Sequence, residues 1–176
     1  MNAGLTAAQQ AMVAPYSESY FKGAQAVDSG KTGIFGNEYG FARNGKSVSF
    51  EGAFSINYYF LPSYEVNGDV TLYVWNANTY ANVNQLTAAN ANHAITATKA
   101  NGGVYSAIVK GIAAKTLDET IYVAAVYTNP NGEACCSGVI AYSLSTYCMN
   151  TAAGNMGALA QATAMYGYYA AQYFAN

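Results

Sequence analysis

Between residues 47 and 60, apolar and polar side chains alternate with a period of two, and this alternation constrains the fold more than any other feature. One set of alternate positions is apolar: Val48, Phe50, Phe54, Ile56, Tyr58 and Phe60. The positions between them are mainly polar: Ser47, Ser49, Glu51, Ser55 and Asn57. Since successive strand residues point to opposite faces of a sheet, the pattern predicts a half-buried β-strand. The run is long for one strand, and Gly52 predicts a bulge or bend within it.

Further β-branched and aromatic runs follow at short intervals, and turn sequences separate several of them. The runs occupy residues 70–75, 94–98, 104–110, 120–127 and 138–145. Asn101-Gly102-Gly103 is a strong hairpin signal because such a turn needs positive φ angles, and residues 129–132 (NPNG) also have turn chemistry. Short strands separated by such turns predict a mainly β fold, an antiparallel Ig-like β-sandwich of about seven strands.

Helical patterns flank the predicted sandwich, which we place at residues 23–149. Residues 1–22 form a predicted N-terminal helical flank, because Thr6 and Gln9 have the spacing of a capping box and Pro15 ends the following Ala-rich run. Residues 150–176 form a predicted C-terminal helix. A Tyr-rich stripe recurs in it at spacings of three and four, and we expect that face to dock on the sandwich: Leu159, Ala162, Tyr166, Tyr169 or Ala170, and Tyr173.

The chain has few charged residues, and this scarcity argues against a nucleic-acid-binding protein and against a polybasic membrane-surface protein. The 176 residues include 7 Lys and Arg, 9 Asp and Glu and 1 His, for a formal net charge of −2. Nucleic-acid binding needs a basic stripe that displaces counterions from phosphates, and a polybasic membrane-surface protein needs a similar excess of Lys and Arg. No apolar run reaches the roughly 18 residues of a membrane span, so we expect no membrane insertion of these residues. The first residues show no signal-peptide pattern.

The thiols and the imidazole do not form the pattern of a metal site. Cys135 and Cys136 are adjacent and therefore point to opposite faces of a strand, while Cys148 lies further along the chain. One extended strand over residues 138–146 separates Cys136 from Cys148 by on the order of 30 Å, beyond the reach of a disulfide. We expect free, buried thiols and no zinc site. His93 has no acidic neighbour in sequence, so we expect a solvated surface residue rather than a functional one.

The acidic residues do not suggest a catalytic site either. They are scattered, and Asp118-Glu119 is the one adjacent pair. Neighbouring strand residues face opposite ways, so this pair could not easily flank one glycosidic bond. A turn that enters the next strand is the expected structure at this point. The sequence therefore predicts a protein that is not an enzyme and that needs no cofactor.

An aromatic and amide-rich cluster is the candidate ligand-binding site. Tyr73 and Trp75 share one face of a predicted strand, Tyr80 follows in the next connection, and Asn76 and Asn78 supply amides. Sugars stack their C–H faces on exposed aromatic rings, and amide groups hydrogen-bond to their hydroxyls. The cluster therefore predicts a carbohydrate-binding site. The alternative is that Trp75 belongs to the core, because large aromatic side chains are mostly buried and a core Trp is common in sandwiches.

Several segments also resemble a recurrent module of large secreted proteins from gut Clostridia and Ruminococcus-like bacteria. The matching stretches are LTAAQQAMV at 5–13, SVSFEGAFSINYYF at 47–60, GIAAKTLDETIYV at 111–123, GVIAYSLSTYC at 138–148 and YGYYAAQYF at 166–174. The resemblance implies a secreted or cell-surface location and a non-catalytic β-sandwich with helical flanks.

The same resemblance suggests a role and a set of partners. It implies one module of a longer protein that acts as a structural spacer or adhesive unit, and it is consistent with one unit of a tandem array. The expected partners are neighbouring modules of the same protein, and glycans or another surface protein are the further possibilities.

Overall fold

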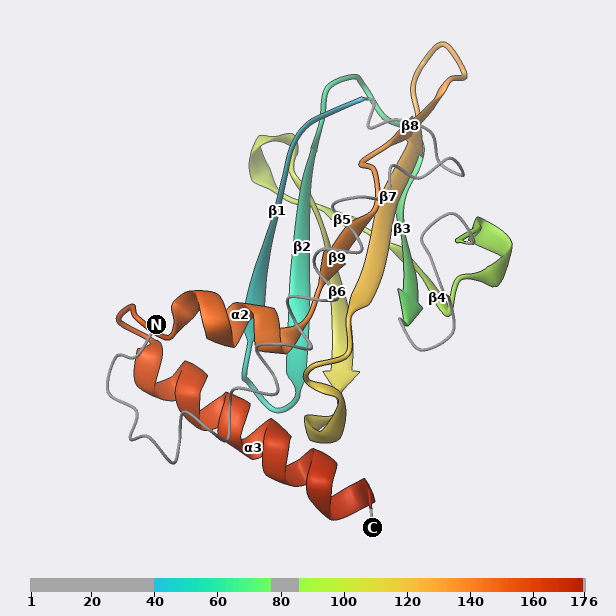
Figure 1. Ribbon diagram of the computed structural model, residues 1–176. Helices are drawn as coiled ribbons and strands as arrows, with labels where there is room; N and C mark the ends of the chain where they lie inside the picture. Colours follow the sequence, from blue (N-terminus) through green and yellow to red (C-terminus); the bar gives the residue numbers. More distant parts are fainter. Residues whose placement is uncertain (1–39, 77–85, 176) are drawn as a thin grey trace.

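The computed structural model describes residues 40–76 and 86–175, which form nine strands and two α-helices (Figure 1). The strands are β1 (Phe41–Ser49), β2 (Phe54–Pro62), β3 (Asn67–Asn76), β4 (His93–Thr96), β5 (Thr98–Lys99), β6 (Tyr105–Ile112), β7 (Ile121–Thr128), β8 (Ala134–Cys136) and β9 (Ile140–Tyr142). The helices are α2 (Leu144–Thr151) and α3 (Gly157–Ala175), and three short 3₁₀ turns are η3 (Ala88–Asn90), η4 (Asn101–Gly103) and η5 (Ala114–Thr116). The predicted N-terminal flank at 1–22 lies outside the described residues.

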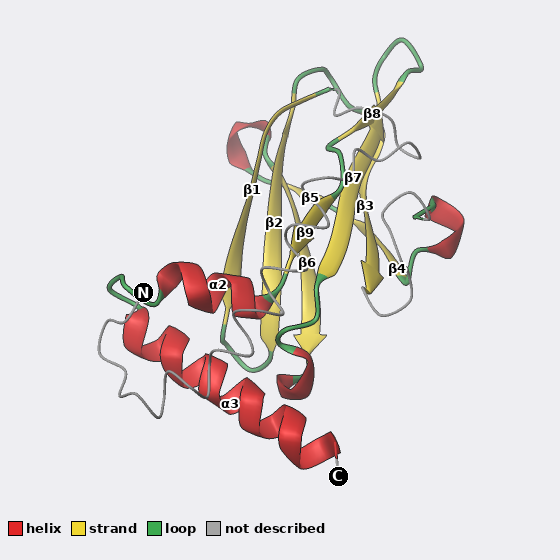
Figure 2. Cartoon of the chain, viewed as in Figure 1, coloured by secondary structure: helices red, strands yellow, loops and turns green. Residues whose placement is uncertain are grey.

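The strands pair into two antiparallel sheets, coloured yellow in Figure 2. One sheet has the order β1-β2-β6-β5, and the other has the order β4-β3-β7-β8 with β9 also paired to β7. Tyr58 pairs with Ala107 in the first sheet, and Leu72 pairs with Ala125 in the second. The prediction of a mainly β, antiparallel fold is therefore confirmed.

The hydrophobic core lies between the two sheets. Alternate residues of β2 and β3 point into it, and each of these side chains has 0% exposure: Ile56, Tyr58, Phe60, Val70, Leu72 and Val74. These are the apolar positions of the period-two runs, so alternation identified the buried face correctly. Full burial of one such side chain contributes about 1.5–3 kcal/mol to folding, so the two strands carry a large part of the stability.

The stretch at 47–60 is a hairpin rather than one bent strand. β1 ends at Ser49, β2 begins at Phe54, and Val48 pairs with Ile56 across the turn. Gly52 lies in that turn with a φ of +75°, a left-handed conformation that favours glycine. The prediction of a single strand was wrong because one period-two pattern continues through both arms and the turn, and Gly52 was its one internal signal.

Between β4 and β5 the chain passes from one sheet to the other through a single residue, Ala97. β4 pairs with β3, whereas β5 pairs with β6 in the opposite sheet. The backbone N–H of Ala97 donates to the carbonyl of Val70 at 2.8 Å. The predicted hairpin turn at Asn101-Gly102-Gly103 joins β5 to β6. Residues 93–96, which precede it, belong to the other sheet.

On the side of the two sheets away from Ala97, one hydrogen bond and one cation–π contact join the layers. The Tyr127 hydroxyl on β7 donates to the carbonyl of Gly40, just before β1, at 2.6 Å. The Lys46 ammonium on β1 lies 4.6 Å from the centre of the Tyr142 ring at the end of β9. Burial lowers the pKa of Lys46, since the charged form loses hydration there.

Only Ile140–Tyr142 of the predicted strand at 138–145 forms a strand. β9 ends at Tyr142, and α2 begins at Leu144. Ser143 caps this helix, because its Oγ accepts from the Thr146 backbone N–H at 3.1 Å and its own N–H donates to Thr146 Oγ1 at 3.2 Å. The Ser-x-x-Thr spacing was the available helix signal, but its second residue is Thr instead of the usual Glu or Gln.

The C-terminal helix is present, but it packs through a different face from the one predicted. The buried residues of α3 are small and recur at helical spacing: Gly157, Ala160, Thr163, Ala164 and Gly167. They lie against η5 and α2, the helix seen beside α3 in Figure 1. A Cβ at Gly167 would lie 2.7 Å from Leu117 Cδ1, so glycine permits this close approach. The Tyr-rich stripe lies on the other face, because it is displaced by two residues, or about 200° around the helix axis.

The three cysteines are free and buried, as predicted. Cys135 and Cys136 are neighbours on β8, while Cys148 is on α2 and packs against Ala160 and Ala164 of α3. Burial raises the pKa of the Cys148 thiol to about 12. The folded protein therefore keeps this proton at pH values where the unfolded chain releases it.

We expect this buried thiol to lower the free energy of unfolding as the pH becomes alkaline. Because the pKa is higher in the folded state, the contribution of Cys148 is complete below the ordinary thiol pKa and is lost as pH rises toward 12. Urea unfolding from about pH 8 to about pH 11 should show a falling free energy of unfolding. The same measurement on Cys148→Ala should show a shallower fall, with a remainder from Tyr58, whose pKa burial also raises. Equal slopes for the two proteins would contradict this assignment.

Candidate functional site

Trp75 lies in a closed cluster on the outer face of the β4-β3-β7-β8 sheet. Its side chain has 0% exposure and packs with Leu86, Ala124 and Cys136. The Tyr73 ring stacks beside it, with ring centres 6.2 Å apart. Sequence alternation places Trp75 on the face away from the main core, and the segment that begins at Leu86 helps to cover it there.

A hydrogen-bonded turn fixes that covering segment to the Trp75 indole. The indole N–H donates to the Thr87 carbonyl at 3.0 Å and to Asn90 Oδ1 at 2.9 Å. Asn90 Oδ1 also accepts from the Thr87 N–H at 2.7 Å, and the Asn90 N–H donates to Thr87 Oγ1 at 3.2 Å. The buried N–H thus has two partners, as a buried indole generally needs.

These contacts correct the expectation of an exposed Trp75 ring in the aromatic cluster. A fully buried ring offers no face to a sugar, so Trp75 belongs to a core, the alternative raised from the sequence. Tyr73 is half-buried against it, and Asn76 is exposed at the end of β3. Asn78 and Tyr80 lie outside the described residues.

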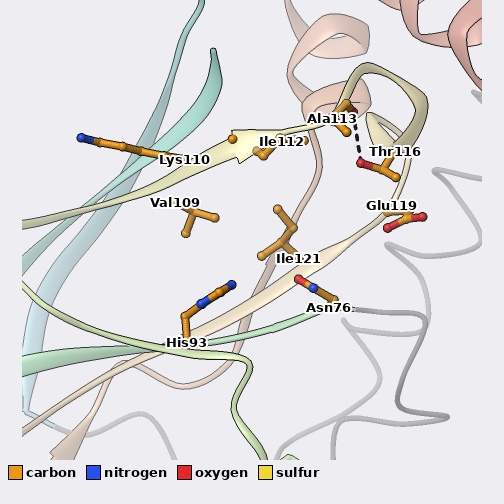
Figure 3. A pocket seen from close by; sticks show the side chains of 10 residues that line it. Asn76, His93, Val109, Lys110, Ile112, Ala113, Thr116, Glu119 and Ile121 are labelled. Carbon is orange, nitrogen blue, oxygen red and sulfur yellow. Dashed lines mark hydrogen bonds between the residues drawn. The ribbon is translucent and has the colours of Figure 1, made fainter.

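His93 and Glu119 both line a pocket that the sequence did not indicate. The pocket has a volume of about 280 Å³ and lies between the two sheets, where β3 and β6 end and β4 and β7 begin (Figure 3). His93 is exposed, as predicted, and it is the first residue of β4. Asp118 and Glu119 lie in the turn that leads into β7, also as predicted. Residues 76, 93 and 119 are too far apart in sequence for their spacing to reveal this neighbourhood.

The second candidate surface is the Tyr-rich face of α3. Its large side chains remain exposed: Met156 47%, Leu159 40%, Tyr166 58%, Tyr169 46%, Tyr173 77% and Phe174 65%. The Lys115 ammonium lies 5.5 Å from the Phe174 ring centre, and the Phe54 and Tyr166 ring centres are 6.3 Å apart. We call Leu159, Tyr166, Tyr169 and Tyr173 the aromatic face, and Met156 and Phe174 flank it at the two ends of the helix. The helical spacing of its members was visible in the sequence, but which of the two faces of the helix packs inward was not.

No protein-family model, curated protein or solved structure matches this chain. Among the described residues, no helix combines the length and the apolar character that crossing a bilayer requires. The described residues also contain no group of three or more His, Cys, Asp or Glu side chains placed to hold a metal ion.

Proposed function

We propose that this chain is a non-catalytic extracellular module of a bacterial surface protein, a spacer or adhesive unit with an Ig-like β-sandwich at its centre. Its partners in this proposal are neighbouring modules of the same protein, which it contacts through the aromatic face of α3. The exposure of that face is the observation that carries the proposal. The location rests on the resemblance of residues 47–60 and 111–123, among other segments, to modules of secreted proteins.

The aromatic face has the chemistry of a protein contact. α3 contains no Asp, Glu, Lys or Arg between Gly157 and Ala175, so an uncharged, apolar partner surface complements it. Tyr, Phe and Met are enriched at protein interfaces, and Tyr buries a large area there at a small cost in side-chain entropy. Soluble monomers rarely expose large contiguous apolar patches, so this cluster of rings favours a docking role.

The proposal predicts that two copies joined end to end are more stable than one. Burial of Tyr166 and Tyr173 against a neighbouring copy should raise the unfolding midpoint of the tandem protein by about 3 °C or more, equivalent to about 1 kcal/mol. Differential scanning calorimetry of the one-copy and two-copy proteins measures this difference. Equal midpoints would contradict intermodule packing.

Variants separate docking by the aromatic face from a general effect of linkage. In the tandem protein, Tyr166→Ser with Tyr173→Ser in both copies should return the midpoint to that of the same variant as a single copy. Tyr64→Ser is the matched control, because Tyr64 is 48% exposed and lies in the connection between β2 and β3. A gain that survives loss of both α3 tyrosines would assign the stabilisation to another surface.

A further inference from the structure

The pocket between the ends of the sheets combines an apolar floor with a polar rim. Val109, Ile112 and Ile121 supply the floor from β6 and β7, and Val109 and Ile121 are each 8% exposed. Gly111 contributes backbone there, and a Cβ at that position would meet no atom within 4 Å, which indicates open space. The floor therefore offers a shallow apolar surface next to solvent.

The rim carries hydrogen-bonding groups from four separate elements. Asn76 ends β3, His93 begins β4, Thr116 belongs to η5, and Glu119 precedes β7. Figure 3 shows Asn76 and His93 on one side of the pocket and Thr116 and Glu119 on the other. The Thr116 hydroxyl donates to the Ala113 carbonyl at 3.1 Å, which leaves its lone pairs free to accept.

The other three rim side chains have unused hydrogen-bonding capacity. Within the described part of the chain, Asn76, His93 and Glu119 make no side-chain hydrogen bond or ion pair. An amide and an imidazole can each donate and accept, and a carboxylate accepts strongly. A ligand that carries several hydroxyl groups matches this set, because each hydroxyl both donates and accepts.

Charge and size narrow the class of ligand. Glu119 and Lys110 are the two formally charged residues of the lining, their signs are opposite, and Figure 3 shows the Lys110 side chain extending away from the pocket. The lining thus provides no excess of positive charge for a phosphate or a carboxylate. A volume of about 280 Å³ is near the lower limit of ligand pockets, which suits one small ring.

We propose that this pocket binds a single neutral sugar ring. The C–H face of the ring lies on Val109, Ile112 and Ile121, and its hydroxyls bond to Asn76, His93 and Glu119. This site shares Asn76 with the aromatic cluster at Trp75 but none of its aromatic residues. It goes beyond the proposed module function and does not depend on it, because α3 contributes no residue to the pocket.

The test uses His93 as a unique reporter. It is the only histidine of the chain, so its ring resonances are unambiguous in NMR spectra. The 176-residue protein is titrated with the methyl glycosides of glucose, galactose and mannose, and with lactose as a sugar at the end of a chain. At least one neutral glycoside should shift the His93 signals saturably, with a dissociation constant in the millimolar range. A stronger response to lactose than to methyl galactoside would identify a glycan end as the source of the ring.

Variants on the rim distinguish the site from weak general binding. Asn76→Ala and Glu119→Gln should each weaken binding about tenfold, the effect of one lost hydrogen bond of good geometry. Glu65→Gln is the matched control. Glu65 is exposed two residues before β3 begins, whereas the pocket lies where β3 ends. Preserved dispersion of the backbone spectrum shows that each variant is folded.

Three results would overturn the proposal. The first is the lack of any saturable shift with all four sugars at concentrations well above the millimolar range. The second is unchanged affinity in both rim variants. The third is tighter binding of glucuronate than of the methyl glucoside, which would indicate an anion site instead of a neutral sugar site.

Discussion

Replacing Trp75 with alanine should lower the free energy of unfolding by about 3–5 kcal/mol, the usual cost of deleting a buried large aromatic side chain. The indole is fully buried between Leu86, Ala124 and Cys136, so its loss leaves a cavity in that cluster. It also removes the donor to the Thr87 carbonyl and to Asn90 Oδ1. Each acceptor keeps a second donor within the turn, the Asn90 N–H for the Thr87 carbonyl and the Thr87 N–H for Asn90 Oδ1, so the cavity accounts for most of the loss.

Urea unfolding followed by far-UV circular dichroism measures this effect, because Trp75 is the only tryptophan and its fluorescence is lost in the variant. Trp75→Phe is the informative comparison. It keeps much of the apolar volume and lacks the N–H, so it should cost less than alanine while still destabilising the protein. A loss below about 1 kcal/mol for Trp75→Ala, the range of an ordinary surface substitution, would contradict a core role for this ring.

Replacing Gly167 with leucine should detach α3 from the rest of the fold. A Cβ at this position would lie 2.7 Å from Leu117 Cδ1 and 3.2 Å from Leu117 Cβ, so a larger side chain must displace the helix or Leu117. Leu117 is 1% exposed and has little room to move. Overpacking of this kind costs about 1–3 kcal/mol, which exceeds the gain of about 1 kcal/mol from removing a helical glycine.

Limited proteolysis, together with urea unfolding, measures this prediction, because a detached helix exposes its backbone to cleavage. Ala158→Leu is the matched control: it adds a leucine to an exposed position of the same helix and should leave both measurements unchanged. Gly167→Ala should give an intermediate result. If Gly167→Leu is as stable and as protease-resistant as the unmodified protein, the small-residue face of α3 is not its packing surface.

Alternation succeeded where one face of a strand meets the core. Ile56, Tyr58 and Phe60 are buried as the period of two required, and so are Val70, Leu72 and Val74. The same rule could not locate the ends of strands, since alternation continues through the turn at Gly52. It also could not reveal Trp75 as buried, because the covering turn at Thr87 and Asn90 is fixed by tertiary hydrogen bonds.

Helical periodicity identified α3 but not the orientation of the helix. Two stripes with the same spacing lie on opposite sides of it, one built from glycine and alanine and one from tyrosine. Hydrophobic size favours burying the tyrosines, whereas close approach to Leu117 favours the small residues. Only the shape of the opposing surface decides between them. The pocket at His93 was unpredictable for a related reason, since four separate elements converge there.

The connection at Ala97 influences how the two sheets separate when the protein partially unfolds. It joins the two layers covalently along the edge that contains β4 and β5, while the far edge is bridged by the Tyr127 hydrogen bond to Gly40 and by Lys46 above Tyr142. Partial opening should therefore resemble a hinged cover, with the axis along Ala97 and the gap widening beside β1. Such opening leaves β1, the outer strand of its sheet, without contacts to the other layer. Its amide hydrogens that pair with β2 should therefore exchange with deuterium earlier than those between the interior strands β3 and β7.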